Sequence, residues 1–112
     1  MAGTPKRTVG PVTLSTTLTT NIYNQASALI YDVLKVLHVC NRTGSAATFS
    51  LWLGATGANA AGTELFTAVS VPANTTSLFY INLRMGSTDF LVGGAGTASA
   101  LTIAVTGEQS VV

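Results

Sequence analysis

Charged side chains are scarce in this sequence. Asp, Glu, Lys and Arg make up 8% of its 112 residues, whereas soluble globular domains carry about 25%. A soluble monomer normally keeps a charged surface, because like charges prevent copies from associating. The sequence therefore indicates either a surface of neutral polar residues or a subunit that other subunits cover. We favour the second interpretation and expect a homo-oligomer, specifically a trimer.

Basic clusters, cysteine pairs and long apolar runs are also missing. The formal net charge is +1 and Lys6 and Arg7 are the only adjacent basic pair, so the chain lacks the basic field that nucleic acid requires. Cys40 is the only cysteine, which excludes an intramolecular disulfide and fits a reducing cytoplasm. No run of about 18 apolar residues occurs, and residues 1–10 contain no apolar segment typical of a secretion signal. We therefore expect neither a nucleic-acid partner nor a membrane.

Groups that perform catalysis are few. If the segment around His38 and Cys40 is a strand, these side chains share a face and form either a nucleophile pair or half of a zinc site. A closed zinc site needs about four ligands and no second Cys/His cluster exists, so we favour a buried cysteine beside a satisfied histidine. The acidic residues are scattered, at Asp32, Glu64, Asp89 and Glu108. We predict no enzymatic activity, no metal and no cofactor.

A glycine-rich segment, Gly94-Ala95-Gly96, is weakly similar to a phosphate-binding loop. Such a loop needs a following helix whose terminal amides hold the phosphate. Residues 98–105 instead show the alternation of a strand. The glycines are therefore predicted to form a bend or bulge after a short strand at 90–92.

Alternation of apolar and polar residues predicts several strands. It is clearest at 48–54, where Phe49, Leu51 and Leu53 face the core and Thr48, Ser50 and Trp52 face the other way. In the last predicted strand, which ends at Gly107, the core side chains are Leu101, Ile103 and Val105. Further strands are predicted at 65–71 and 76–83, with one or two short strands at 11–23 and a Gly/Ala/Asn loop at 55–62.

The segment 27–41 fits two patterns. Ile30, Val33, Leu34 and Leu37 fit a helical stripe, and Ser27 would be its N-cap. Tyr31, Val33, Leu37 and Val39 instead fit one face of a strand. The content of β-branched and aromatic residues favours the strand.

Seven or eight short strands with regular turn signals predict an all-β fold, an antiparallel β-sandwich or jelly roll. Residues 11–112 form its single domain. Residues 1–10 are predicted to be an extended N-terminal arm, because Pro5 and Pro11 lack the amide hydrogen that a central strand donates.

Three residues are candidates for partner binding. Lys6 and Arg7 lie on the predicted arm, where their charges would meet an acidic patch on a partner or a neighbouring subunit. Trp52 lies on the polar face of its strand. It is either a partly exposed anchor for a partner or a cap over the core at the sandwich edge, and the sequence leaves both open.

Five segments resemble a family. They are TPKRTVGP (4–11), HVCNRTGSAATFSLWLG (38–54), AAGTELF (60–66), VPANTT (71–76) and ASALTIAVTGE (98–108). Together they are similar to small structural proteins of tailed bacteriophages, and they span nearly the whole chain. The segment 24–30 departs from the family's pattern, which has a Val-Pro-Ala-like turn there. The resembling segments are turns and strands without catalytic signatures.

The resemblance implies a β-sandwich component of the virion, present in many copies and assembled in the cytoplasm of the host bacterium. The favoured function is a capsid decoration or cement protein that binds the head surface as an oligomer, with the major capsid protein or another virion protein as its partner. The alternative is a tail, collar or baseplate component with a receptor- or glycan-facing surface. A free carbohydrate-binding module ranks last, because aromatic residues make up only 7% of the chain.

Overall fold

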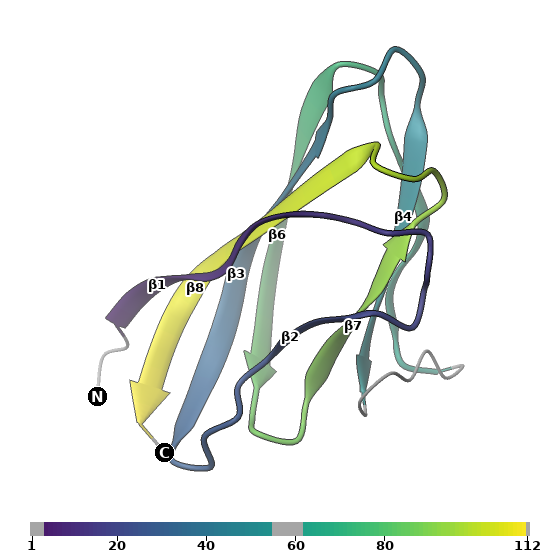
Figure 1. The fold of residues 1–112 in the computed structure, drawn as a ribbon. Coiled ribbons are helices and arrows are strands. Elements are labelled where there is room, and N and C mark those ends of the chain that lie inside the picture. Colours follow the sequence, from purple (N-terminus) through teal and green to yellow (C-terminus); the bar gives the residue numbers. More distant parts are fainter. Residues whose placement is uncertain (1–3, 55–61, 112) are drawn as a thin grey trace.

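Antiparallel strands make up the fold of this protein (Figure 1). The computed structural model describes residues 4–54 and 62–111, and these contain eight strands and no helix. No helix in this part of the chain is therefore long and apolar enough to cross a membrane. The strands are β1 (Thr4–Thr13), β2 (Asn21–Asn24), β3 (Ile30–Asn41), β4 (Ala47–Gly54), β5 (Glu64–Val71), β6 (Thr75–Met85), β7 (Phe90–Ala95) and β8 (Leu101–Val111).

The strands form two sheets of four that pack face to face. Sheet A has the order β1-β8-β3-β6 and sheet B the order β2-β7-β4-β5, at the left and right of Figure 1 respectively. Every connection except that between β4 and β5 crosses from one sheet to the other. This strand order is that of an eight-stranded jelly roll. The predicted all-β sandwich is confirmed.

The core lies between the sheets and follows the predicted alternation. Phe49 and Leu51 on β4 are buried, and Leu53 packs against the core while half-buried. The predicted core residues of β8 are also buried, namely Leu101, Ile103 and Val105.

Three phenylalanines tie the two sheets together. Phe49 and Phe66 belong to sheet B, and Phe79 belongs to sheet A. Their ring centroids lie 5.3–5.5 Å apart in tilted and edge-to-face arrangements. Aromatic pairs favour these geometries. The cluster therefore joins β6 to β4 and β5 across the sandwich.

The ambiguous segment is a strand, β3, and the helical alternative is wrong. The four side chains predicted to share one face of this strand do not do so, because the inward and outward positions exchange partway along β3. Leu34 pairs with Gly107 of β8 and Val36 with Thr106, so that two steps on β3 match one step on β8. Lys35 is the extra residue of a β-bulge. Because of it, Tyr31 and Val33 face outward while Leu37 and Val39 face the core.

Two strands continue through glycines that were predicted to interrupt or end them. β7 runs through Gly93 and Gly94 in regular register with β4, and β8 runs past Gly107 to Val111. A Cβ at Gly93 would lie 2.1 Å from the carbonyl oxygen of Ser50, and one at Gly107 would lie 2.0 Å from that of Val33. These glycines therefore permit a close approach of neighbouring backbones.

The predicted arm at 1–10 is largely part of the sandwich. Residues 4–10 belong to β1, which pairs with β8 at the edge of sheet A. Thr8 and Val9 are buried, and this burial offsets the loss of amide donors at Pro5 and Pro11. The domain therefore begins at β1, not at residue 11. Most of the predicted loop at 55–62 lies outside the described residues.

Candidate functional site

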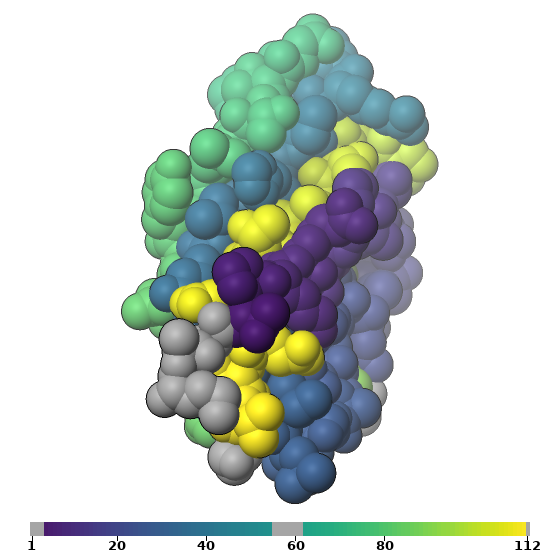
Figure 2. Space-filling view, turned by 90° about the vertical axis from the view of Figure 1, so that its left-hand side faces the viewer, coloured from purple at the N-terminus to yellow at the C-terminus, as the bar shows by residue number. Residues whose placement is uncertain are grey.

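The outer face of sheet A is the largest surface on which functional candidates gather. Figure 2 looks onto it, with β1 in purple, β8 in yellow, β3 in blue and β6 in green side by side. One row across it joins Arg7, Thr106, Val36 and Tyr80, because each is the register partner of the next. The face is therefore a continuous surface of four strands.

The charges on this face are mostly basic. Lys35 projects from the bulge and binds Glu108 with an Nζ–Oε2 distance of 3.0 Å. The Arg84 guanidinium lies 4.4 Å from the ring centroid of Tyr31. Arg7 is exposed. Three basic residues and one acidic residue give the face a formal charge of +2, in a chain whose total is +1.

The rest of the same face carries no Lys, Arg, Asp or Glu on its strands and mixes apolar with polar side chains. Its next row joins Ala104, His38 and Leu78. Tyr80 and Leu78, both on β6, are 79% and 47% exposed. These large side chains stand on the outer face instead of in the core, so the outer face of β6 exposes two large side chains beside the polar Thr76 and Asn82.

His38 and Cys40 share this outer face, as their spacing predicted, and both are partly exposed. The predicted burial of Cys40 is therefore incomplete. Within the described residues no group of three or more His, Cys, Asp or Glu side chains is placed to hold a metal.

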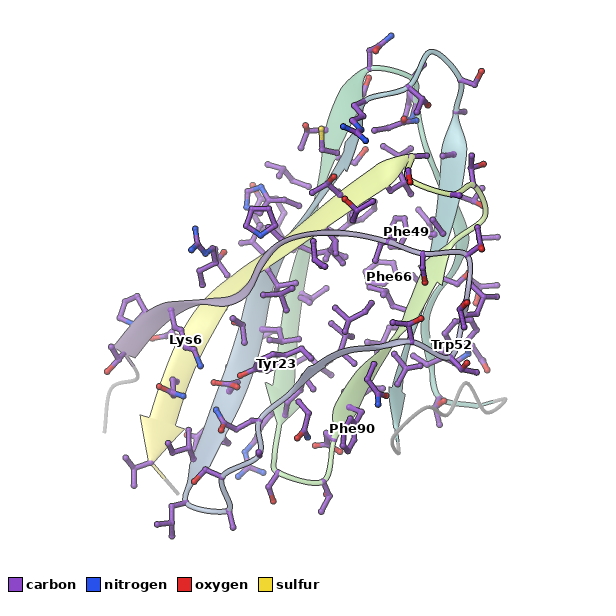
Figure 3. All side chains as sticks on the ribbon, in the orientation of Figure 1. Lys6, Tyr23, Phe49, Trp52, Phe66 and Phe90 are labelled. Carbon is purple, nitrogen blue, oxygen red and sulfur yellow. The ribbon has the colours of Figure 1, made fainter. Side chains whose placement is uncertain are left out.

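Lys6 points in the opposite direction from Arg7. Its Nζ donates to the Tyr23 hydroxyl at 3.5 Å and lies 5.8 Å from the centroid of that ring. Figure 3 shows Lys6 on β1 and Tyr23 on β2 facing each other between the sheets. Successive strand residues face opposite ways, so the two adjacent charges cannot both serve one outer surface.

A buried carboxylate lies behind this contact. Asp32 is 0% exposed, and its Oδ2 accepts hydrogen bonds from the Tyr23 hydroxyl and, at 3.1 Å, from Gln25 Nε2. Burial, together with the hydrogen bond to Asp32 and its negative charge, raises the pKa of Tyr23 well above its ordinary value. The phenol therefore stays protonated and donates. The Oδ1 atom of Asp32 has no partner among the described residues.

Trp52 is buried. It faces away from the core on β4, opposite Val92 of β7, and Figure 3 places it on the outer side of sheet B, away from Phe49 and Phe66. It is nonetheless only 8% exposed. Trp52 is therefore not an exposed anchor, and it lies outside the core cluster that the capping alternative would have it cover.

A small cavity lies where β1 leads into β2. It has a volume of about 100 Å³, and its lining includes Val12, Leu14, Thr20 and Gly93. No residue of the lining carries a charge. The cavity therefore holds no acid, base or nucleophile set for catalysis.

Comparison with protein-family models, with curated proteins and with solved structures finds no match to this chain. The functional argument therefore depends on the geometry described above and on the resemblance carried by the sequence. Of the three predicted binding residues, Arg7 alone is exposed on the candidate face. Tyr80 and Leu78 were not predicted, although their place on the polar side of the alternation at 76–83 was a signal for them.

Proposed function

We propose that the protein is a structural component of a bacteriophage virion, specifically a capsid decoration protein that binds the head surface as a homo-oligomer, with a trimer as the expected form. The outer face of sheet A is the observation that carries this proposal. It combines the exposed side chains of Leu78 and Tyr80 with a net positive charge. Exposed apolar surface of this kind marks interaction sites on soluble proteins.

Binding to the shell would use the charged and the uncharged side chains of this face differently. Arg7, Lys35 and Arg84 attract an acidic surface and orient the approach, because interfacial charges mainly govern steering and register. Leu78 and Tyr80 supply the apolar area that leaves water on binding. The protein needs no catalytic group, metal or cofactor for this role.

Copy number decides between a head and a tail location. Quantitative mass spectrometry of purified virions should find hundreds of copies per particle for a decoration protein. A few dozen copies or fewer would instead support the alternative tail, collar or baseplate component. Absence from virions would contradict both.

A second experiment tests the face itself. Heads that lack the protein are mixed with purified Arg7→Glu protein, which reverses a charge on the candidate face. We expect weaker binding than for the unmodified protein, and binding of the latter should fall as salt screens its charges. Arg42→Glu is the matched control, because Arg42 is exposed in the turn after β3, beyond the last residue of β3 that pairs within sheet A. Equal binding by all three proteins would rule the face out.

A further inference from the structure

The two sheets have four edge strands, and three of these are interrupted. β1 contains Pro5 and Pro11 and shifts its register against β8 twice. β2 has four residues. β5 shifts register against β4 near Ala68, which has a φ of 46° and whose amide bonds to Ser50 Oγ. Proteins commonly protect exposed sheet edges by such devices, because an open edge pairs with other chains.

The fourth edge, β6, is the least interrupted of the four. It is 11 residues long, contains neither proline nor glycine, and carries one charge, Arg84. Its pairing with β3 shifts once, between Leu34 and Val36, yet exposed and half-buried residues alternate without a break along β6 from Thr76 to Arg84. Within the described residues β3 is its only hydrogen-bonded neighbour. The edge of β6 that faces away from β3 therefore presents free amide and carbonyl groups.

We propose that β6 pairs in antiparallel orientation with β6 of a second copy of this chain. The two copies of sheet A then form one continuous eight-stranded sheet. This inference rests on the self-association in the proposed function and deepens it, since it adds a twofold contact through which the subunits of one expected trimer would pair with those of a second.

The position of Arg84 favours the antiparallel over the parallel orientation of the two β6 strands. Parallel pairing in register would set Arg84 against its own copy, and like charges directly opposite each other are destabilising. Antiparallel pairing centred on Tyr80 sets Arg84 opposite Thr76. The same register sets Tyr80 beside Tyr80 of the second copy, and cross-strand aromatic pairs are favourable. It also extends the outer face of sheet A across both subunits.

The contact has twofold symmetry, so it produces dimers. Combined with a threefold contact of the kind expected from composition, it produces hexamers. A single pair of strands is a small interface, and small interfaces are weak. If neighbouring copies are attached to one shell, their local concentration is high, and this would strengthen the weak contact between them.

Sedimentation equilibrium of the purified protein, in a series reaching about 1 mM, tests the pairing. We expect dimers or hexamers, and slower hydrogen exchange at 75–85 as concentration rises. Tyr80→Lys should weaken association roughly tenfold or more, because it sets two lysines opposite each other. Its side chain is 79% exposed, so circular dichroism should show an intact fold. Leu78→Lys is the alternative variant if it does not.

Ser70→Lys is the matched control, since Ser70 is an exposed residue of the interrupted edge β5. It should associate like the unmodified protein. A monomer at the highest concentration, a discrete trimer, or equal weakening by the β6 and β5 variants would overturn the pairing. A protein that dimerises through β6 but is absent from virions would keep this inference and lose the proposed function.

Discussion

At the scale of single residues, the hydrogen bond between the half-buried Tyr23 and the buried Asp32 links the two sheets. A buried carboxylate that loses a donor costs about 1–3 kcal/mol. Tyr23→Phe should therefore lower the free energy of unfolding by about that amount at neutral pH. Urea titration measures this directly. Tyr80→Phe, which removes a hydroxyl from an exposed ring, is the control and should leave stability unchanged.

The same pair predicts a dependence on alkaline pH. The pKa of Tyr23 is raised in the folded protein above its ordinary value of 10.0. The contribution of Tyr23 to the free energy of unfolding is therefore complete below about pH 10. It is lost at higher pH, where Tyr23 releases its proton in the unfolded chain but keeps it in the folded chain. Urea titrations repeated up to about pH 11 should show a shallower decline for Tyr23→Phe than for the unmodified protein. Equal slopes would contradict the raised pKa.

Residue directions also show where sequence reasoning is limited. The alternation at 48–54 correctly placed Phe49 and Leu51 in the core, because the period of a strand is local. That Trp52 is covered, and that Lys6 turns inward to Tyr23, depends on contacts between sheets. No local pattern encodes such contacts. Of the three residues predicted to bind a partner, only Arg7 is exposed on the surface, as the sequence had suggested.

At the scale of elements, the strands were predicted well and their irregularities were not. The bulge at Lys35 arises from how β3 pairs with β8, and it reverses the face on which the later residues lie. Glycines in β7 and β8 were interpreted as a bend or bulge and as the end of a strand, because a sequence does not distinguish these from a close backbone approach. Gly93 and Gly107 are needed for the second reason.

β1 gives an element-scale prediction. Deleting residues 2–10 removes buried Val9 and the contact between Lys6 and Tyr23. Burial of one valine is worth about 1.5–3 kcal/mol, so the deletion should lower the melting temperature while the remaining strands still fold. Arg7→Ala, at an exposed site, should change stability by no more than about 0.5 kcal/mol. A deletion variant that melts like the unmodified protein would show that β1 is not part of the stable sandwich.

At the scale of the whole molecule, sheet A and sheet B differ in character. Sheet A carries three of the five basic residues on its outer face and ends in the long edge strand β6, whose exposed and half-buried residues alternate from Thr76 to Arg84. In sheet B both edges are short or shifted in register. The proposed self-association and the proposed shell binding therefore both involve sheet A, one at its edge and the other on its face.

The position of β8 has a consequence for biosynthesis. β8 lies between β1 and β3, so sheet A has no continuous ladder until the strand that leaves the ribosome after the other seven is in place. A fragment ending at residue 100 should fail to give the circular dichroism spectrum of the folded protein, whereas the deletion of 2–10 keeps it. Pairing of strands so distant in sequence also folds slowly, in milliseconds to seconds. Until then the apolar inner faces of β3 and β4 remain open to solvent, and nascent chains crowded on one messenger RNA would be most prone to aggregate during that interval.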